Sequence, residues 1–136
     1  MEQIVYIPSP LGTTKIVGDA NGVSIISILQ EGELSKKIPK ELKEAVTQLN
    51  EYFEGKRQHF DFKINPKGTD FQQKVWEELL KIPFGKTMSY LDLSKKLGDV
   101  KAIRAVASAN GKNPLWIVVP CHRVIGTDGS LTGYAG

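Results

Sequence analysis

The spacing of apolar residues changes near the middle of the chain, and this change constrains the fold most strongly. Before it, runs rich in β-branched residues alternate with turn signals, which predicts strands over 4–7, 14–19 and 23–29. Asn21-Gly22, between the last two runs, is typical of a tight hairpin turn. After the change, apolar residues recur at helical spacing. The pattern predicts an α+β fold: a small antiparallel sheet with one helix, followed by a mainly helical part.

One helix is predicted in the first part, over residues 40–54. Pro39 suits its start and Gly55 suits its end. Its apolar residues form a single stripe: Leu42, Ala45, Val46, Leu49, Tyr52 and Phe53. The stripe is typical of a helix that packs on a sheet. Residues 60–64 are a candidate further strand.

A turn-forming segment, Asn65-Pro66-Lys67-Gly68, divides the chain into two predicted domains. The first is an α/β domain over 1–66, and the second covers 67–136. Residues 1–68 carry nine Lys and Arg against nine Asp and Glu, whereas residues 69–136 carry nine against six. The second half therefore holds the whole net charge of +3, which permits contact with a polyanion without proving it.

Three helices are predicted in the second domain. Thr69 and Gln72 form a capping box that opens the first. The apolar residues of this helix are expected to be buried, namely Phe71, Val75, Trp76, Leu79 and Leu80. Ser89 caps the second helix, over 90–97, and the third spans 100–110. The last two helices and the tight turn between them form a winged helix-turn-helix-like pattern, which packing alone would also explain.

The helix predicted over 100–110 has an unusual outward face. Ile103, Val106 and Ala107 are expected to face inward. The outward residues are Lys101, Ala102, Arg104, Ala105, Ser108 and Ala109. Alanines around one long cation let a backbone approach another molecule closely, so one interpretation is a DNA-docking helix whose Arg104 inserts into the base stack. The other interpretation is that alanine simply favours helix.

The chain has a single cysteine, in the segment Pro120-Cys121-His122-Arg123. The flanking residues 116–119 and 124–125 are predicted to be extended, and Thr127-Asp128-Gly129 is predicted to form a turn. One cysteine cannot form an internal disulfide. With only His59 and His122 beside it, the chain cannot supply four zinc ligands, so no metal site is predicted.

A nucleophilic role for Cys121 requires a base, because a free thiol is mostly protonated near neutral pH. His122 is the candidate base. Consecutive residues of a strand point to opposite faces, so this pair would need a turn or a bridging water. An inert buried cysteine is the alternative.

Several of these features belong to one set of motifs that occur in a fixed order along the chain. The set consists of Phe71-Gln72-Gln73-Lys74-Val75-Trp76, Phe84-Gly85, Ser89-Tyr90, Arg104-Ala105-Val106, Asn113-Pro114, Pro120-Cys121-His122-Arg123-Val124 and Gly133-Tyr134-Ala135-Gly136. It resembles the O6-alkylguanine-DNA alkyltransferases, also called methylated-DNA–protein-cysteine methyltransferases. The Pro-Cys-His-Arg-Val core is the hallmark of that family. Residues 1–66 are similar to its variable N-terminal domain only in general layout.

The resemblance implies roles for individual residues. Cys121 looks like the alkyl acceptor, and His122 like the base that polarises it through water. Asn113 resembles the asparagine that joins the two halves and holds the surroundings of the nucleophile. Tyr90 resembles the residue that turns the target phosphate and donates a hydrogen bond to guanine, and Arg104 the residue that fills the gap left by the flipped nucleotide. The other implied DNA contacts are Gln72, Asp99, Lys101, Ala102, Ala105 and Thr127. The implied pocket residues are Val124, Tyr134, Ala135 and Trp116.

The function implied by the resemblance is DNA repair by direct, irreversible and stoichiometric alkyl transfer. The donor would be O6-alkylguanine in duplex DNA, with O4-alkylthymine as a second candidate, and the base would first be flipped out of the stack. Such a protein acts once, as a monomer, without a cofactor. Family members continue beyond the position of Gly136 into a helix whose glutamate hydrogen-bonds the histidine corresponding to His122. This sequence stops at Gly136, so either the chain is truncated or another group orients His122.

Two alternatives to the transferase remain at this stage. Non-enzymatic alkyl-lesion-binding relatives lack the acceptor cysteine, so Cys121 argues against that class. A Cys-His hydrolase would need a third group to orient the base and an oxyanion hole, for which the sequence has no evident signature.

The longest apolar run, 116–120, is too short to span a bilayer, and residues 1–3 do not resemble the start of a secretory signal. A cytoplasmic location without membrane contact is therefore expected.

Overall fold

A computed structural model describes residues 2–125 of the chain. The described residues form two compact units. Unit 1 consists of 2–67 together with 114–116, and unit 2 consists of 68–113 together with 117–125. Within the described residues, no helix is long and apolar enough to cross a membrane.

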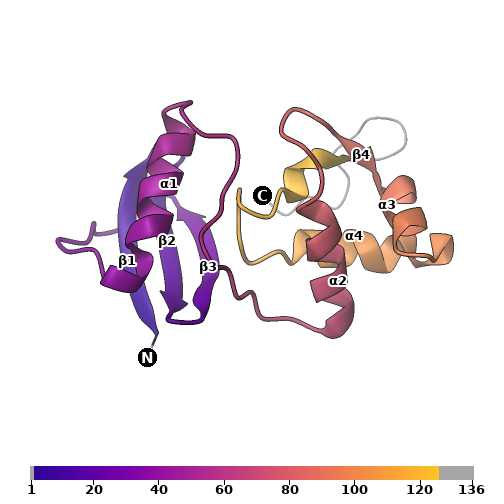
Figure 1. The fold of residues 1–136 in the computed structure, drawn as a ribbon, viewed down its shortest axis with the longest axis horizontal. Coiled ribbons are helices and arrows are strands. Elements are labelled where there is room, and N and C mark those ends of the chain that lie inside the picture. Colours follow the sequence, from indigo (N-terminus) through magenta and orange to yellow (C-terminus); the bar gives the residue numbers. More distant parts are fainter. Residues whose placement is uncertain (1, 126–136) are drawn as a thin grey trace. The chain divides into compact units, whose positions relative to one another are not determined.

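Unit 1 is built on an antiparallel three-stranded sheet in the order β1-β2-β3 (Figure 1). Its strands are β1 Gln3–Ser9, β2 Gly12–Asp19 and β3 Gly22–Leu29. Val5 lies opposite Ile16, which lies opposite Ile26. All three side chains are fully buried, so this row forms the centre of the sheet's core face. The three strands expected from the sequence are confirmed.

The hairpin between β2 and β3 turns where the Asn21-Gly22 pair predicts. The Asp19 carboxylate accepts a hydrogen bond from the Asn21 N–H at 2.8 Å. Gly22 has φ +132, and a Cβ at this position would lie 2.9 Å from the carbonyl carbon of Ile64. Glycine is therefore required there for its backbone conformation and for the close approach of a neighbouring segment.

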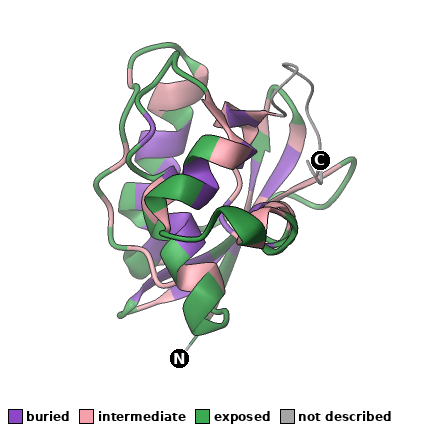
Figure 2. Cartoon of the chain, turned by 90° about the vertical axis from the view of Figure 1, so that its right-hand side faces the viewer, coloured by how far each residue is buried: buried purple, intermediate pink, exposed green. Residues whose placement is uncertain are grey.

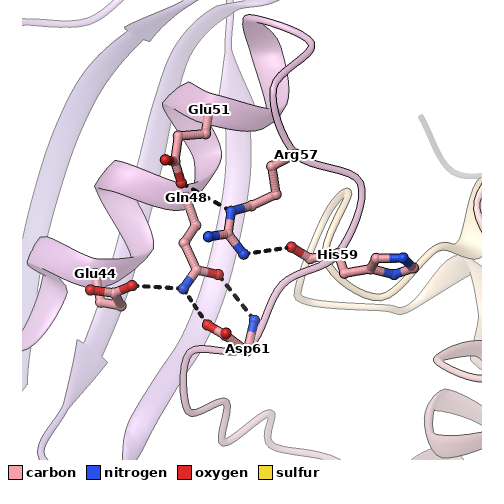
Figure 3. A network of polar contacts seen from close by, with 6 residues as sticks. All are labelled: Glu44, Gln48, Glu51, Arg57, His59 and Asp61. Carbon is pink, nitrogen blue, oxygen red and sulfur yellow. Dashed lines mark hydrogen bonds and ion pairs between the residues drawn. The ribbon is translucent and has the colours of Figure 1, made fainter.

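The predicted helix of unit 1 is confirmed as a 3₁₀ turn, η1 Lys40–Leu42, that continues into α1 Lys43–Phe53. The helix lies along the sheet (Figure 1), and the first four apolar residues of its stripe are buried: Leu42, Ala45, Val46 and Leu49. Gln48 is fully buried among them. Its amide Nε2 donates to Glu44 and to Asp61, and its Oε1 accepts from the Asp61 N–H (Figure 3). Every polar atom of this buried amide thus has a partner.

The strand predicted over 60–64 is wrong except at its end. Only Ile64 bridges to β3, opposite Val23. The Asp61 N–H is used by the Gln48 side chain instead of a sheet partner (Figure 3). Phe60 packs its ring against Tyr52, with centroids 5.2 Å apart. Side-chain contacts with α1 therefore replace the backbone ladder that the aromatic-rich segment suggested.

The described residues of unit 2 contain three α-helices, which confirm the sequence prediction. They are α2 Asp70–Leu79, α3 Tyr90–Lys96 and α4 Ile103–Gly111, the last preceded by the 3₁₀ turn η2 Val100–Ala102. The capping box is present, with Thr69 and Gln72 bonding each other's backbone N–H at 2.9 and 3.1 Å. Both α2 and α3 pack against α4. This arrangement is the helix-turn-helix-like part of the predicted fold class.

The buried face of α2 is narrower than predicted. Val75, Trp76 and Leu79 are buried, whereas Phe71 and Leu80 are 37% and 44% exposed. Phe71 and Leu80 lie at the two ends of the apolar stripe, where the described packing partners of α2 do not cover them. On α4 the prediction was wrong in the other direction, because Ala109 was expected to be exposed and is buried. Its carbonyl accepts a hydrogen bond from the Trp76 indole N–H at 2.9 Å. Figure 2 shows the buried residues in purple and the exposed ones in green.

Residues 116–119 form a turn rather than the predicted extended segment. Just before it, the Ile26 N–H donates to the Pro114 carbonyl and the Trp116 N–H donates to the Ile26 carbonyl, so 114–116 follow β3 in unit 1. Ile117 then has φ 73, an uncommon value for a β-branched residue, and the chain turns there. The turn predicted at 127–129 lies outside the described residues.

The extended segment 124–125 is confirmed as β5 Val124–Ile125. It pairs in parallel with a strand that the sequence did not reveal, β4 Met88–Ser89. Met88 lies opposite Val124, and Ser89 lies opposite Ile125. Helix α3 begins directly after β4, and β5 directly follows the segment that contains Cys121. The pair therefore fixes the start of α3 beside that segment.

Candidate functional site

Cys121 lies in a single 3₁₀ turn, η3 Cys121–Arg123, immediately after Pro120. The Cys121 N–H donates to the Val119 carbonyl at 2.8 Å, and the Arg123 N–H donates to the Pro120 carbonyl at 3.0 Å. The cysteine is free and only 7% exposed. A turn is one of the two arrangements that the sequence argument required for cooperation between Cys121 and His122. The side chains of these neighbours are thus not forced onto opposite faces, as they would be in a strand.

The thiol of Cys121 is held in its protonated form. Burial raises its pKa, and a hydrogen bond from the Asn113 side chain and backbone N–H groups of the turn lower the pKa by less. Asn113 is itself 7% exposed and also donates to the Val119 carbonyl at 2.7 Å. The same amide group therefore contacts the sulfur and the chain two residues before it. This placement agrees with the supporting role predicted for Asn113, which remains a prediction.

His122 is half-buried and follows the cysteine in the turn. Burial lowers its pKa, and the positive charge of Arg123 lowers the pKa further. The imidazole is therefore neutral near physiological pH and has a nitrogen that can accept a proton. A neutral base beside a protonated thiol is the resting state from which a cysteine nucleophile is activated.

Tyr90 is the first residue of α3 and is buried. Ser89 caps this helix, since its Oγ accepts from the Asp92 N–H at 3.0 Å. Burial raises the pKa of the Tyr90 hydroxyl, a hydrogen bond from Asn110 lowers it, and the nearby Cys121 sulfur raises it again. The phenol consequently keeps its proton and can serve as a hydrogen-bond donor. Asn110 bonds both this hydroxyl and the Cys121 carbonyl, so the phenol lies near the cysteine turn.

Asn110 belongs to this cluster, and the sequence interpretation missed it. It is 1% exposed, near the end of α4. Its Nδ2 donates to the Tyr90 hydroxyl at 3.1 Å and to the Cys121 carbonyl at 3.3 Å. One signal was present in the sequence. Position 110 continues the inward row of Ile103, Val106 and Ala107 at helical spacing, and a polar residue on such a row requires an explanation.

Arg123 is a second residue that the sequence reasoning did not single out by role. Its Nη1 donates to the Ile82 carbonyl at 2.7 Å, and its guanidinium lies 5.6 Å from the centroid of the Phe84 ring. Ile82 and Phe84 follow α2, so the arginine ties the segment after α2 to the cysteine turn. Phe84 remains 44% exposed.

The outward face of α4 is arranged around Arg104 as predicted, except that Ala109 is buried. Arg104 and Ala105 are exposed in its first turn, Lys101 is exposed just before it, and Ala102 is half-buried. Within the described part of the chain, no hydrogen bond or ion pair holds the Arg104 guanidinium. Asp99 caps the preceding turn, where its carboxylate accepts from the Lys101 N–H at 2.9 Å. A contact of these residues with DNA stays a prediction.

The remaining predicted residues fall into three groups. Gln72 is half-buried and its side-chain oxygen is used by the capping box. Val124 is fully buried in β5, and Trp116 is half-buried in unit 1. Thr127, Tyr134 and Ala135 lie outside the described residues. The structure thus brings Cys121, Asn113, Tyr90 and Asn110 together in unit 2, with His122 next to the nucleophile.

The fold and this cluster define a class of protein: an α+β protein that carries a free cysteine, with a neutral histidine beside it, in the same unit as a helix-turn-helix. Comparison with known families narrows the class. Residues 4–66 match the family model for the 6-O-methylguanine DNA methyltransferase ribonuclease-like domain, and residues 70–136 match the model for its DNA binding domain. The chain belongs to the 6-O-methylguanine DNA methyltransferase family.

Individual relatives agree with this assignment. The chain is 44% identical over 136 residues to the methylated-DNA–protein-cysteine methyltransferase of Methanosarcina barkeri, covering 95% of this chain and 85% of that protein. It is 44% identical to the constitutive enzyme of Bacillus subtilis, covering 94% and 83%. Among solved structures, the Mycobacterium tuberculosis O6-methylguanine methyltransferase aligns with a TM-score of 0.86 at 43% identity, covering 100% and 86%. The structure of the Mycobacterium tuberculosis OGT in complex with DNA aligns with 0.84 at 44% identity, covering 95% and 81%.

Proposed function

We propose that the protein repairs DNA by moving the alkyl group of O6-alkylguanine onto the sulfur of Cys121 in one irreversible step. The observation that carries this proposal is the free Cys121 beside a neutral His122, in the unit that matches the DNA binding domain model. Relatives named methylated-DNA–protein-cysteine methyltransferases at 44% identity support it. A relative solved in complex with DNA supports DNA as the partner.

The transfer is a displacement at the alkyl carbon. The Cys121 thiol gives its proton to His122, directly or through water, and the sulfur attacks the carbon. The C–S bond forms while the C–O6 bond breaks, and the bonding electrons leave with guanine, which takes up a proton. The product is a thioether that no group of the site can cleave, so each molecule acts once. O4-alkylthymine offers the same kind of leaving group and is a second candidate donor.

The buried phenol of Tyr90 supports the departure of guanine. Negative charge develops on the base as the C–O6 bond breaks, and a hydrogen-bond donor that faces this charge lowers the barrier. The alkylated base must first leave the stack, because a thiol in a buried turn cannot reach O6 inside a duplex. Lesions weaken base pairing and so lower the cost of extrusion. Val124, Tyr134 and Ala135 stay candidates for the pocket that receives the base.

The two predicted domains then have different roles. Residues 67–136 bind DNA and accept the alkyl group, with Arg104 entering the gap left by the flipped nucleotide. The candidates that hold the DNA around it are Gln72, Asp99, Lys101, Ala102, Ala105 and Thr127. Residues 1–66 form the separate N-terminal domain. We infer that the protein acts in the cytoplasm, because a lone thiol stays reduced there. We also infer that it acts as a monomer.

Intact mass spectrometry with peptide mapping tests the transfer directly. The protein is incubated with a duplex containing one O6-methylguanine, and we expect a gain of one methyl group per chain, located on Cys121. The Cys121→Ala variant should bind the same duplex and gain nothing. Binding without any gain in the wild-type protein would instead show a non-enzymatic lesion-binding protein. Repeated conversion of substrate per chain would contradict the single-use step.

The pH dependence of the transfer should change when His122 is replaced. With a neutral base of lowered pKa, the single-turnover rate constant of the wild-type protein should be level above about pH 6.5 and fall only in acid. In His122→Ala the thiolate must form without help. Since burial raises the pKa of Cys121, the rate constant should rise about tenfold per pH unit between about pH 7 and about pH 8.5.

The exposed His59 of unit 1 provides the control for this experiment. His59→Ala removes the chain's other imidazole, while the hydrogen bond from Arg57 goes to the backbone carbonyl at position 59 and is kept. Its profile should match that of the wild-type protein. Parallel profiles for wild type and His122→Ala would show that His122 is not the base.

A further inference from the structure

We propose that Asn110 is a positioning residue for alkyl transfer, which fixes the Tyr90 hydroxyl as a hydrogen-bond donor toward the substrate while holding the backbone of Cys121. This inference rests on the function proposed above. The motif that identifies the cysteine does not include Asn110, and its placement follows only from the folded chain.

The geometry requires both partners of Asn110 to act as acceptors. The Nδ2 atom carries two hydrogens and no lone pair available for accepting. One hydrogen is donated to the Tyr90 hydroxyl oxygen at 3.1 Å and the other to the Cys121 carbonyl at 3.3 Å. All three residues belong to unit 2, and Asn110 is 1% exposed. Because both bonds come from one planar group, they restrain the phenol and the cysteine backbone together.

The consequence for Tyr90 concerns the direction of its proton. A hydroxyl that accepts from Asn110 cannot also donate to the same nitrogen, so its own proton must point elsewhere. Within the described part of the chain, no group accepts that proton from Tyr90. Among the residues that the structure describes, the phenol is therefore a donor without an acceptor, and it shares Asn110 with the Cys121 carbonyl. An incoming base with developing negative charge is the kind of acceptor that this arrangement suits.

The energetics do not favour a purely structural role for Asn110. Its Oδ1 is buried and has no hydrogen-bond partner among residues 2–125. The two bonds made by Nδ2 are offset by the cost of desolvating this unpaired acceptor. An apolar residue of similar size would fill the position without that cost. The amide therefore contributes more to the orientation of its two partners than to the stability of α4.

A double-mutant cycle tests the inference. Asn110→Leu keeps the volume and removes both hydrogen bonds, and Tyr90→Phe removes the hydroxyl. We expect each single variant to lower the single-turnover rate constant at saturating duplex about tenfold, which corresponds to the loss of one oriented hydrogen bond. The double variant should lose less than about threefold beyond Tyr90→Phe, since Asn110 acts through the hydroxyl. DNA affinity should be unchanged in Asn110→Leu, since the buried Asn110 side chain makes no proposed contact with DNA.

Two further variants separate orientation from general disturbance of the site. Ser94→Ala removes a buried side-chain bond to the Tyr90 carbonyl, at 2.9 Å, without touching the hydroxyl. It should change the thermal midpoint but leave the methyl-transfer rate constant within about twofold. Asn110→Asp has nearly the size of the wild-type side chain and only accepts hydrogen bonds, so it should capture the Tyr90 proton and react slowly even where Asn110→Leu does not fold.

The outcomes distinguish this inference from the proposed function. A wild-type protein that gains no methyl group overturns both. A wild-type protein that reacts, while both Asn110 variants react equally fast, overturns the inference alone. Rate losses that multiply in the double variant would show that Asn110 acts independently of Tyr90, and would also overturn it.

Discussion

Arg104→Ala is expected to lower the single-turnover rate constant for methyl transfer from a duplex by about 100-fold, without changing the thermal midpoint. Extrusion of a base costs a few kcal/mol of stacking and pairing, and a side chain that fills the gap recovers part of that cost. Arg104 is exposed in the first turn of α4 and is surrounded by small residues. Its substitution should therefore leave the packing of unit 2 intact.

A single-stranded substrate distinguishes gap filling from simple charge attraction. If Arg104 fills the stack, the deficit of Arg104→Ala should shrink to less than about tenfold when O6-methylguanine is presented in a single strand, where the stack is already weak. A residue that only contacts phosphates would lose similar activity on both substrates. Lys112→Ala is the matched control, because Lys112 is an exposed cation at the other end of α4. It should react within about twofold of the wild-type rate.

The second large effect concerns stability. Trp76→Ala is expected to reduce the free energy of unfolding by about 3–5 kcal/mol, because it leaves a cavity at the contact between α2 and α4. Trp76 is 2% exposed, and its indole N–H bonds the Ala109 carbonyl at 2.9 Å. Trp76→Phe retains much of the volume but loses this bond, so about 1–2 kcal/mol is expected. Urea titration followed by circular dichroism measures both losses.

Phe71→Ala is the matched control on the same helix. Phe71 is 37% exposed, so its removal should cost less than about 1 kcal/mol. Gly68→Ala probes the same contact from the other side, since a Cβ there would lie 2.5 Å from the Trp76 ring. Its cost should fall in the Trp76→Phe background, where the smaller ring makes room. Equal losses for Phe71→Ala and Trp76→Ala would show that the α2–α4 contact is not the core of unit 2.

Features encoded by neighbouring residues were predictable from the sequence. The β2–β3 hairpin at Asn21-Gly22 and the capping box at Thr69 depend on contacts within a few residues, so both could be read locally. The turn at 116–119 could not. Its β-branched residues suit a strand, but residues 114–116 follow the distant β3, and Ile117 adopts φ 73. Such long-range pairing overrides local propensity and leaves no local pattern.

The residues of the candidate site likewise divide into those that the sequence marks and those that only long-range packing brings together. Cys121 and His122 are marked by adjacent residues, and the resemblance supplied the more distant Tyr90, Arg104 and Asn113. Asn110 was missed because its partners lie 20 positions before it and 11 positions after it, and only packing brings them together. Likewise, the exposure of Phe71 depends on which elements cover the ends of α2, and periodicity alone does not specify them.

The chain's two tryptophans are divided between the units, Trp76 in unit 2 and Trp116 in unit 1. An indole that is buried and hydrogen-bonded, like that of Trp76, emits in an environment unlike the one it meets in the unfolded chain. With Trp116→Phe, the tryptophan fluorescence of the protein would report on the α2–α4 contact alone. The reciprocal variant, Trp76→Phe, leaves an emitter in the segment that follows β3. Each unit thus carries its own fluorescent probe, and the unfolding of unit 2 can be followed without a label.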